Sequence, residues 1–133
     1  GVSMFLRGFA VWLVIIFAES LHGTARVKLL EPYVGDLRAR QIALFTGMAI
    51  ILAIAIAFIR WIRAMNFSQR LAVGFLWATL TFVFEILLGR FALNYTWERI
   101  LSDYNLRQGG LMSIGIIFLI FAPLLATKIR GIR

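Results

Sequence analysis

Apolar residues along the chain are gathered into four long stretches separated by shorter polar segments. The stretches cover about residues 4–21, 42–62, 71–88 and 111–126, and each approaches or reaches the roughly 20 residues that a helix needs to cross a bilayer. Backbone polar groups in lipid must bond within their own segment, so each stretch is predicted to be α-helical. The pattern therefore predicts an all-α integral membrane protein with four transmembrane helices.

The segments between the stretches contain signals that interrupt or start helices. Pro32 and Gly35 are predicted to break the chain before the second span. The second loop lacks such residues, and aromatic side chains there favour a short interfacial helix. Asp36, Asp103 and Ser68 are predicted to cap the second, fourth and third helices, since a side-chain oxygen at such a position accepts a hydrogen bond from the first turn.

Polar residues recur in the same order in the two halves of the chain. Sliding the sequence against itself aligns Glu19 with Glu85 and, after a one-residue insertion, aligns "D-L-R-A-R-Q" (residues 36–41) with "D-Y-N-L-R-Q" (residues 103–108). Apolar matches are common between any two membrane helices, whereas ordered polar matches are not. The recurrence therefore indicates an internal repeat.

This repeat predicts how the chain is organised. We expect a single membrane domain over residues 1–133, formed by two tandem helix-loop-helix repeats at about 4–66 and 70–133. Each repeat contains two spans, so both enter the bilayer from the same side and should be related by pseudo-twofold symmetry along the membrane normal. That symmetry places the polar groups of both repeats near one face of the membrane.

These polar groups form the candidate ligand or ion site. They are Glu19, His22, Arg40, Gln41, Glu85, Arg107 and Gln108. In a structural interpretation, Glu19 pairs with Arg40 and Glu85 pairs with Arg107, and each salt bridge clamps one hairpin. In a functional interpretation the carboxylates mark a solute or ion route, because ionisable residues within spans often do. Each arginine can also pair with the aspartate one turn before it, Asp36 or Asp103.

Composition excludes several other kinds of site. The chain is 62% hydrophobic over 133 residues, with no cysteine and a single histidine. Disulfides, thiolate metal sites and multi-histidine centres are therefore excluded. Arginines interleaved among the carboxylates would repel a hard cation. We expect no metal site and no cofactor.

Charge distribution bears on partners and orientation. The net charge of +8 is spread over the ends of the apolar stretches, which favours interfacial anchoring over nucleic-acid binding. Half of the 14 Lys and Arg residues lie on each side of the membrane, so the count alone is a tie. The charges near the termini are clustered without acids, and we predict a bacterial inner (plasma) membrane protein with both termini in the cytoplasm.

The apolar surface and a row of small residues bear on whether the chain contacts lipid and other protein chains. Ala49, Ala53 and Ala57 form a stripe that predicts close helix packing, either within the bundle or between chains. We expect the chain to contact membrane lipid and to assemble into a homo-oligomer or a larger membrane complex.

Three functions remain open, and we rank them in order. The first is a non-catalytic subunit or scaffold, in which the repeated polar groups hold the hairpins in register. The second is a small-solute or ion transporter or channel in which Glu19 and Glu85 flank a shared pathway. The third is a lipid-modifying intramembrane enzyme, ranked last because no nucleophile and base are paired at facing positions. We therefore expect that the chain is not an enzyme.

Overall fold

The computed structural model describes residues 2–104 and 112–131, and the regular structure in these ranges is helical. The long helices are α1 (Val2–Ala25), α3 (Asp36–Ile62), α4 (Phe67–Leu87) and α6 (Met112–Ile129). With the helical continuations of α1 and α4, all four are long and apolar enough to cross a membrane. The predicted all-α chain with four candidate membrane spans is confirmed.

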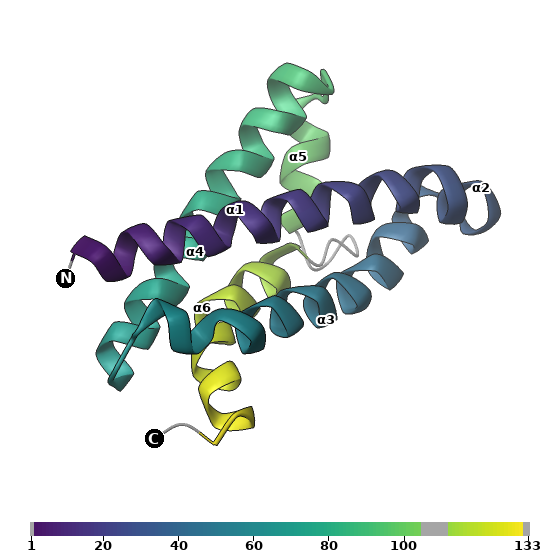
Figure 1. Ribbon diagram of the computed structural model, residues 1–133. Helices are drawn as coiled ribbons and strands as arrows, with labels where there is room; N and C mark the ends of the chain where they lie inside the picture. Colours follow the sequence, from purple (N-terminus) through teal and green to yellow (C-terminus); the bar gives the residue numbers. More distant parts are fainter. Residues whose placement is uncertain (1, 105–111, 132–133) are drawn as a thin grey trace.

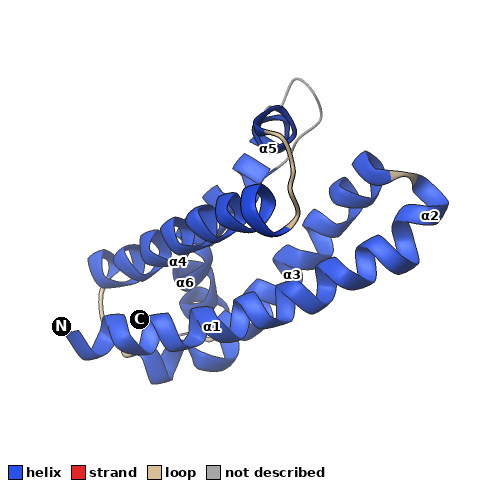
Figure 2. Ribbon diagram, turned by 90° about the horizontal axis from the view of Figure 1, so that it is seen from above, coloured by secondary structure: helices blue, strands red, loops and turns tan. Residues whose placement is uncertain are grey.

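The long helices pack as two antiparallel pairs that meet at one end. α1 lies beside α3 and α4 beside α6, with further contacts of α3 on α6 and of α1 on α4. The start of α1, the α3–α4 connection and the end of α6 lie at the same end of the molecule (Figure 1). We call this the closed end. At the opposite, open end the tip of the α1–α3 hairpin lies apart from the segment that follows α4 (Figure 2).

Shorter helical elements continue the first helix of each pair. α1 runs into the π-helical turn η1 (Arg26–Leu30), and α4 runs into η2 (Leu88–Ala92). The one-turn helix α2 (Glu31–Val34) ends at Gly35, whose φ is 87°. Glycine adopts this conformation without steric cost, so the predicted break before the second span is confirmed. The short helix expected in the second loop is α5 (Trp97–Tyr104).

The core lies towards the closed end, where all four long helices meet. The largest fully buried side chains there are Val11, Ile15, Ile62, Val73, Trp77 and Leu119. Two indole groups connect α1 with α4: Trp77 Nε1 donates to the Gly8 carbonyl and Trp12 Nε1 donates to Thr81 Oγ1, each at 2.9 Å. A buried indole N–H needs an acceptor, so these two bonds fix how the helices cross.

Helices α4 and α6 approach each other closely at Gly74. A Cβ atom at this position would overlap the backbone carbonyl oxygen of Ile120. Backbone cannot move aside as a flexible side chain can, so only glycine permits this contact.

The connection between α3 and α4 is short and held by hydrogen bonds. Arg63, after the last residue of α3, has a φ of 61°, the left-handed conformation that often ends helices. The buried side chain of Arg70 donates from Nε to the Ala64 carbonyl at 3.0 Å and from Nη2 to the Met65 carbonyl at 3.4 Å. The connection is therefore fixed from within the closed end.

Two predicted helix caps are wrong. Asp36 is the first residue of α3, whose N-cap is the preceding glycine. At the start of α4 the cap is Asn66, whose Oδ1 accepts from the backbone N–H of Gln69 at 2.8 Å, while Ser68 lies within the first turn. A capping side chain must sit just outside the helix on extended backbone, as that of Asn66 does. Asp103 lies within α5, and its side chain is outside the described residues.

The buried face of α3 differs from the predicted small-residue stripe. Its small members are Ala39, Ala43, Gly47 and Ala55. Ala49, Ala53 and Ala57 are exposed instead, so they are not a contact within the bundle. Small residues occupy both faces of this helix, and their spacing alone did not distinguish the face that packs. Contact of the exposed stripe with a second chain stays a prediction.

Candidate functional site

A cleft of about 620 Å³ lies between the two helix pairs, beyond the core. Its inner end is apolar, with Ile15, Ile51 and Leu119 on its walls. Charged and polar side chains from α1, α3, α4 and α5 line the remainder. The volume is in the usual range for small-molecule sites, roughly 300–1,000 Å³.

The structure gathers several of the predicted site residues around this cleft. Those that line it are Glu19, His22, Arg40, Gln41 and Glu85. Arg107 and Gln108 lie outside the described residues. The carboxylates of α1 and α4 thus share one space, although they come from different halves of the chain.

The carboxylate of Glu19 lies against the backbone of α3. A Cβ atom at Gly47 would be 3.0 Å from Glu19 Oε2 and 3.5 Å from Oε1, so glycine leaves the room that the carboxylate occupies. Oε2 is 3.5 Å from Nδ1 of His22. Oε1 is buried and has no hydrogen-bond partner among the described residues. Buried carboxylate oxygens are seldom left in that condition.

His22 connects Glu19 to α3 through a hydroxyl group. Its Nε2 is 2.6 Å from Thr46 Oγ1, and the same hydroxyl donates to the Ala43 carbonyl at 3.2 Å. This network assigns the hydrogen on the ring to Nε2. Nδ1 then faces the Glu19 carboxylate, with Oε2 at 3.5 Å.

The predicted clamp between Glu19 and Arg40 is replaced by other pairs. Arg40 Nη2 lies 3.2 Å from Asp36 Oδ2, one turn earlier in α3, so the predicted pairing of those two residues is confirmed. Glu19 Oε2 instead lies 3.5 Å from Nδ1 of His22. Residues four apart on one helix face meet without ordering a second element, which favours Asp36 over Glu19 as the partner of Arg40.

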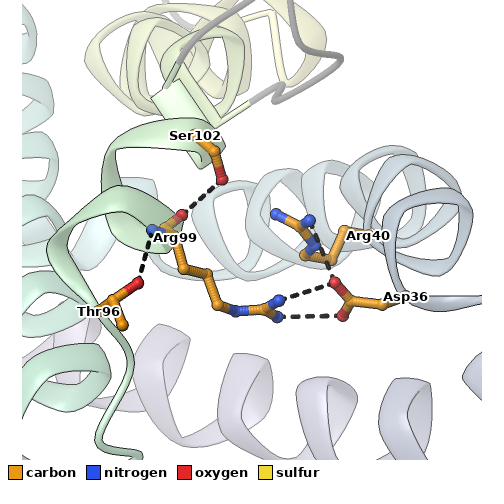
Figure 3. Close-up of polar contacts among 5 residues, drawn as sticks. All are labelled: Asp36, Arg40, Thr96, Arg99 and Ser102. Carbon is orange, nitrogen blue, oxygen red and sulfur yellow. Dashed lines mark hydrogen bonds and ion pairs between the residues drawn. The ribbon is translucent and has the colours of Figure 1, made fainter.

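Asp36 also joins the two halves of the chain through Arg99 of α5, which the sequence pattern did not single out. Arg99 Nη1 lies 2.9 Å from Asp36 Oδ2, and Nη2 lies 3.0 Å from Oδ1 (Figure 3). This is the bidentate geometry that makes arginine–carboxylate pairs strong. The guanidinium also lies over the Tyr95 ring, with Cζ 4.2 Å from the ring centroid. The hydrogen bond to Asp36 raises the pKa of Arg99.

The first turn of α5 sets the position of Arg99. Thr96 caps this helix, because its Oγ1 accepts from the backbone N–H of Arg99 at 3.2 Å, and Ser102 Oγ donates to the Arg99 carbonyl at 2.6 Å (Figure 3). A threonine three residues before Arg99 is a helix-start signal that the sequence does carry. That signal locates the helix but not the carboxylate that its arginine meets.

Basic groups lie nearer the open end than the carboxylates. Arg26 follows Glu19 by seven residues, which places it on the same helical face about 10 Å further along the axis. It lines the cleft together with Arg40 and Arg99. The cleft therefore has an acidic level, formed by Glu19 and Glu85, and a rim where Arg26, Arg40 and Arg99 line it. The Asp36 carboxylate pairs with Arg40 and Arg99 at this rim.

The site has to be interpreted from its own chemistry. Comparison of the chain with models of protein families, with curated proteins and with solved structures finds no match. Within residues 2–104 and 112–131, no three acidic or histidine side chains are grouped as a metal site requires. The arrangement offers two carboxylates deep in the cleft, an imidazole beside one of them, and guanidinium groups nearer the open end.

Proposed function

We propose that this protein is a small-solute transporter in which the cleft is the solute site and Glu19 and Glu85 flank the pathway. The observation that carries the proposal is that Glu19 and Glu85, which come from different halves of the chain, both line one cleft of about 620 Å³. An ionisable group inside a span is costly unless it has a partner or a function. The scaffold hypothesis gave Glu19 a structural partner in Arg40, whereas Arg40 lies against Asp36.

The closed end favours a transporter over an open channel. The core around Trp77 fills the space between the cleft and the closed end, and the indole bonds of Trp12 and Trp77 hold α1 and α4 together there. A solute entering from the open end would stop at the acidic level. Passage to the other side then requires the helix pairs to move relative to each other.

The repeat and the orientation are part of the same proposal. In each half, a long helix with a glutamate in its last two turns continues into a five-residue π-helical turn, which supports tandem repeats related by a pseudo-twofold axis. The basic residues at the closed end have no acids among them in the sequence, which supports both termini in the cytoplasm of a bacterial inner membrane. Bound lipid and assembly into an oligomer stay predictions.

Solute entry into proteoliposomes tests the transporter proposal. Vesicles are exposed to hyperosmotic choline chloride, sodium acetate or trialanine, and re-swelling is followed by stopped-flow light scattering. We expect at least one of these solutes to enter faster than into protein-free vesicles. We expect the excess rate to be lost when Glu19→Gln and Glu85→Gln are combined.

The matched control removes two acids that do not line the cleft, by Glu31→Gln with Glu98→Gln. This variant should retain the wild-type rate. The proposal fails if no solute in the panel enters faster than into protein-free vesicles, or if the excess rate survives the loss of Glu19 and Glu85.

A further inference from the structure

Charged side chains of opposite sign line this cleft. Glu19 and Glu85 contribute carboxylates, whereas Arg26 and Arg99 contribute guanidinium groups. Hydrogen bonds in which one partner is ionised are stronger than neutral ones. A ligand that lies along the cleft can therefore be held through donors at the carboxylates and through acceptors at the guanidinium groups.

The carboxylates and the guanidinium groups lie at different depths. Glu19 is level with Gly47, in the second quarter of α3. Arg26 is about 10 Å nearer the open end along α1, and Arg99 pairs with the first residue of α3, also nearer the open end. Positive charge on a ligand is therefore favoured at the inner level and negative charge at the rim.

We propose that the cleft binds a zwitterion whose ammonium group lies against Glu19 and Glu85 and whose carboxylate lies against Arg26 and Arg99. The ligand must be long enough to place its two charges at different depths of the cleft, as a short extended peptide can. Short peptides are thus one chemical class that fits. This inference rests on the proposed function, because it names the class of solute for the same site.

Ligands of simpler charge fit less well. A plain cation meets like charge at Arg26 and Arg99, and a plain anion meets like charge at Glu19 and Glu85. A zwitterionic phospholipid carries its charges in the opposite order, with the phosphate nearer the bilayer centre and the ammonium group outside it. The acidic level of this cleft lies inside the rim lined by arginines, which matches the reverse order.

Binding of three matched probes tests the inference on the whole chain in lipid nanodiscs. The probes are trialanine, N-acetyl-trialanine, which lacks the ammonium group, and trialanine amide, which lacks the carboxylate. Isothermal titration calorimetry should give at least tenfold tighter binding for trialanine than for either derivative. Equal binding of the three probes, or no binding of trialanine, would overturn the inference.

Substitutions in the cleft test whether the ammonium group of the probe lies at the glutamates and its carboxylate at the arginines. Combining Glu19→Gln with Glu85→Gln should abolish discrimination against the acetylated probe and keep discrimination against the amide. Arg26→Gln should do the reverse, and it carries the test if the double variant does not fold. Arg38→Gln is the control, because Arg38 is exposed and does not line this cleft. Loss of both discriminations in any one folded variant contradicts the assignment.

Trialanine binding and vesicle re-swelling test the zwitterion site and the transporter activity separately. Selective trialanine binding without faster vesicle re-swelling would retain the zwitterion site and reject the transporter. Faster re-swelling without discrimination among the three probes would retain the transporter and reject the zwitterion site.

Discussion

Asp36 at the start of α3 and Arg99 in the first turn of α5 form a two-point ion pair between the two halves of the chain. Their oxygen–nitrogen distances are 2.9 and 3.0 Å, and Arg40 approaches the same carboxylate from within α3. Both side chains are about one-third exposed, at 32% and 30%. Partial shielding and bidentate geometry make such a pair worth more than an ordinary surface ion pair.

Removing either member of this pair is expected to weaken the fold and to do so non-additively. Asp36→Asn and Arg99→Gln should each lower the free energy of unfolding by about 1–2 kcal/mol, with a coupling energy of about 1 kcal/mol in the double variant. Chemical unfolding of detergent-solubilised protein measures all three values. Arg38→Gln, in the same turn as Asp36 but exposed, should change stability little. Strictly additive losses would show that the two side chains act independently.

A methyl group at Gly47 is expected to displace the Glu19 carboxylate. In Gly47→Ala the new Cβ would lie 3.0 Å from Glu19 Oε2, the end of a flexible side chain, so the carboxylate moves and the helices need not. Stability should stay within about 1 kcal/mol, while the excess rate of solute entry falls several-fold. Gly8→Ala is the matched control, since Gly8 does not line the cleft and a Cβ there would meet Val73 at an ordinary 3.4 Å. Equal rates in the two variants would contradict the assigned role of Gly47.

The close approach of α4 and α6 predicts a large penalty at Gly74. Gly74→Ala places a Cβ onto the backbone oxygen of Ile120, so the helices must separate, at a cost of about 1–3 kcal/mol or more. Gly8→Ala meets the side chain of Val73 at an ordinary 3.4 Å and should be tolerated. Thermal unfolding in detergent compares them. Similar losses for both glycines would mean that α4 and α6 do not pack as described.

Water access distinguishes the cleft from the lipid-facing surface of α1. The chain has no cysteine, so single replacements can be labelled without background. Ser20→Cys, on the cleft, should react with a membrane-impermeant maleimide, because thiolate formation needs water. Phe17→Cys, one turn away at a side chain that is 68% exposed on the apolar surface, should remain unlabelled in the bilayer. Reagent added to one side of sealed vesicles reports which side the open end faces, and equal labelling of both positions would refute a water-filled cleft.

Features that depend on neighbouring residues could be predicted from the sequence, whereas contacts between residues far apart in the chain could not. The long apolar runs define membrane helices because burial in lipid depends on local composition, and Gly35 ended a helix because its left-handed conformation is a property of the residue itself. The caps failed for a different reason. Asp36 has the side chain of a cap, but its carboxylate binds Arg99, 63 positions away in the chain, and no local spacing encodes that partner.

Sequence predicted some of the residues that line the cleft but not how they pair, and it did not single out Arg26 or Arg99. Helical periodicity placed Glu19 and His22 together and Asp36 and Arg40 together, since those pairs are three or four residues apart. The partners that cross between elements were not evident, because they depend on how far the two halves separate at the open end. Gly47 illustrates this: its role next to Glu19 follows from contact between α1 and α3, and nothing in its sequence neighbourhood indicates it.

The hydrogen bonds of Arg70 to the α3–α4 connection have a mechanical consequence. They fix the molecule at the closed end, whereas the helices extend from the Gly8–Trp77 crossing to Arg26 over about 27 Å. A relative rotation of about 5° at the crossing would displace the rim by about 2 Å over that length. Such a displacement is enough to separate Asp36 from Arg99. The stiffness of the closed end therefore determines how far the two helix pairs separate at the open end for a given force.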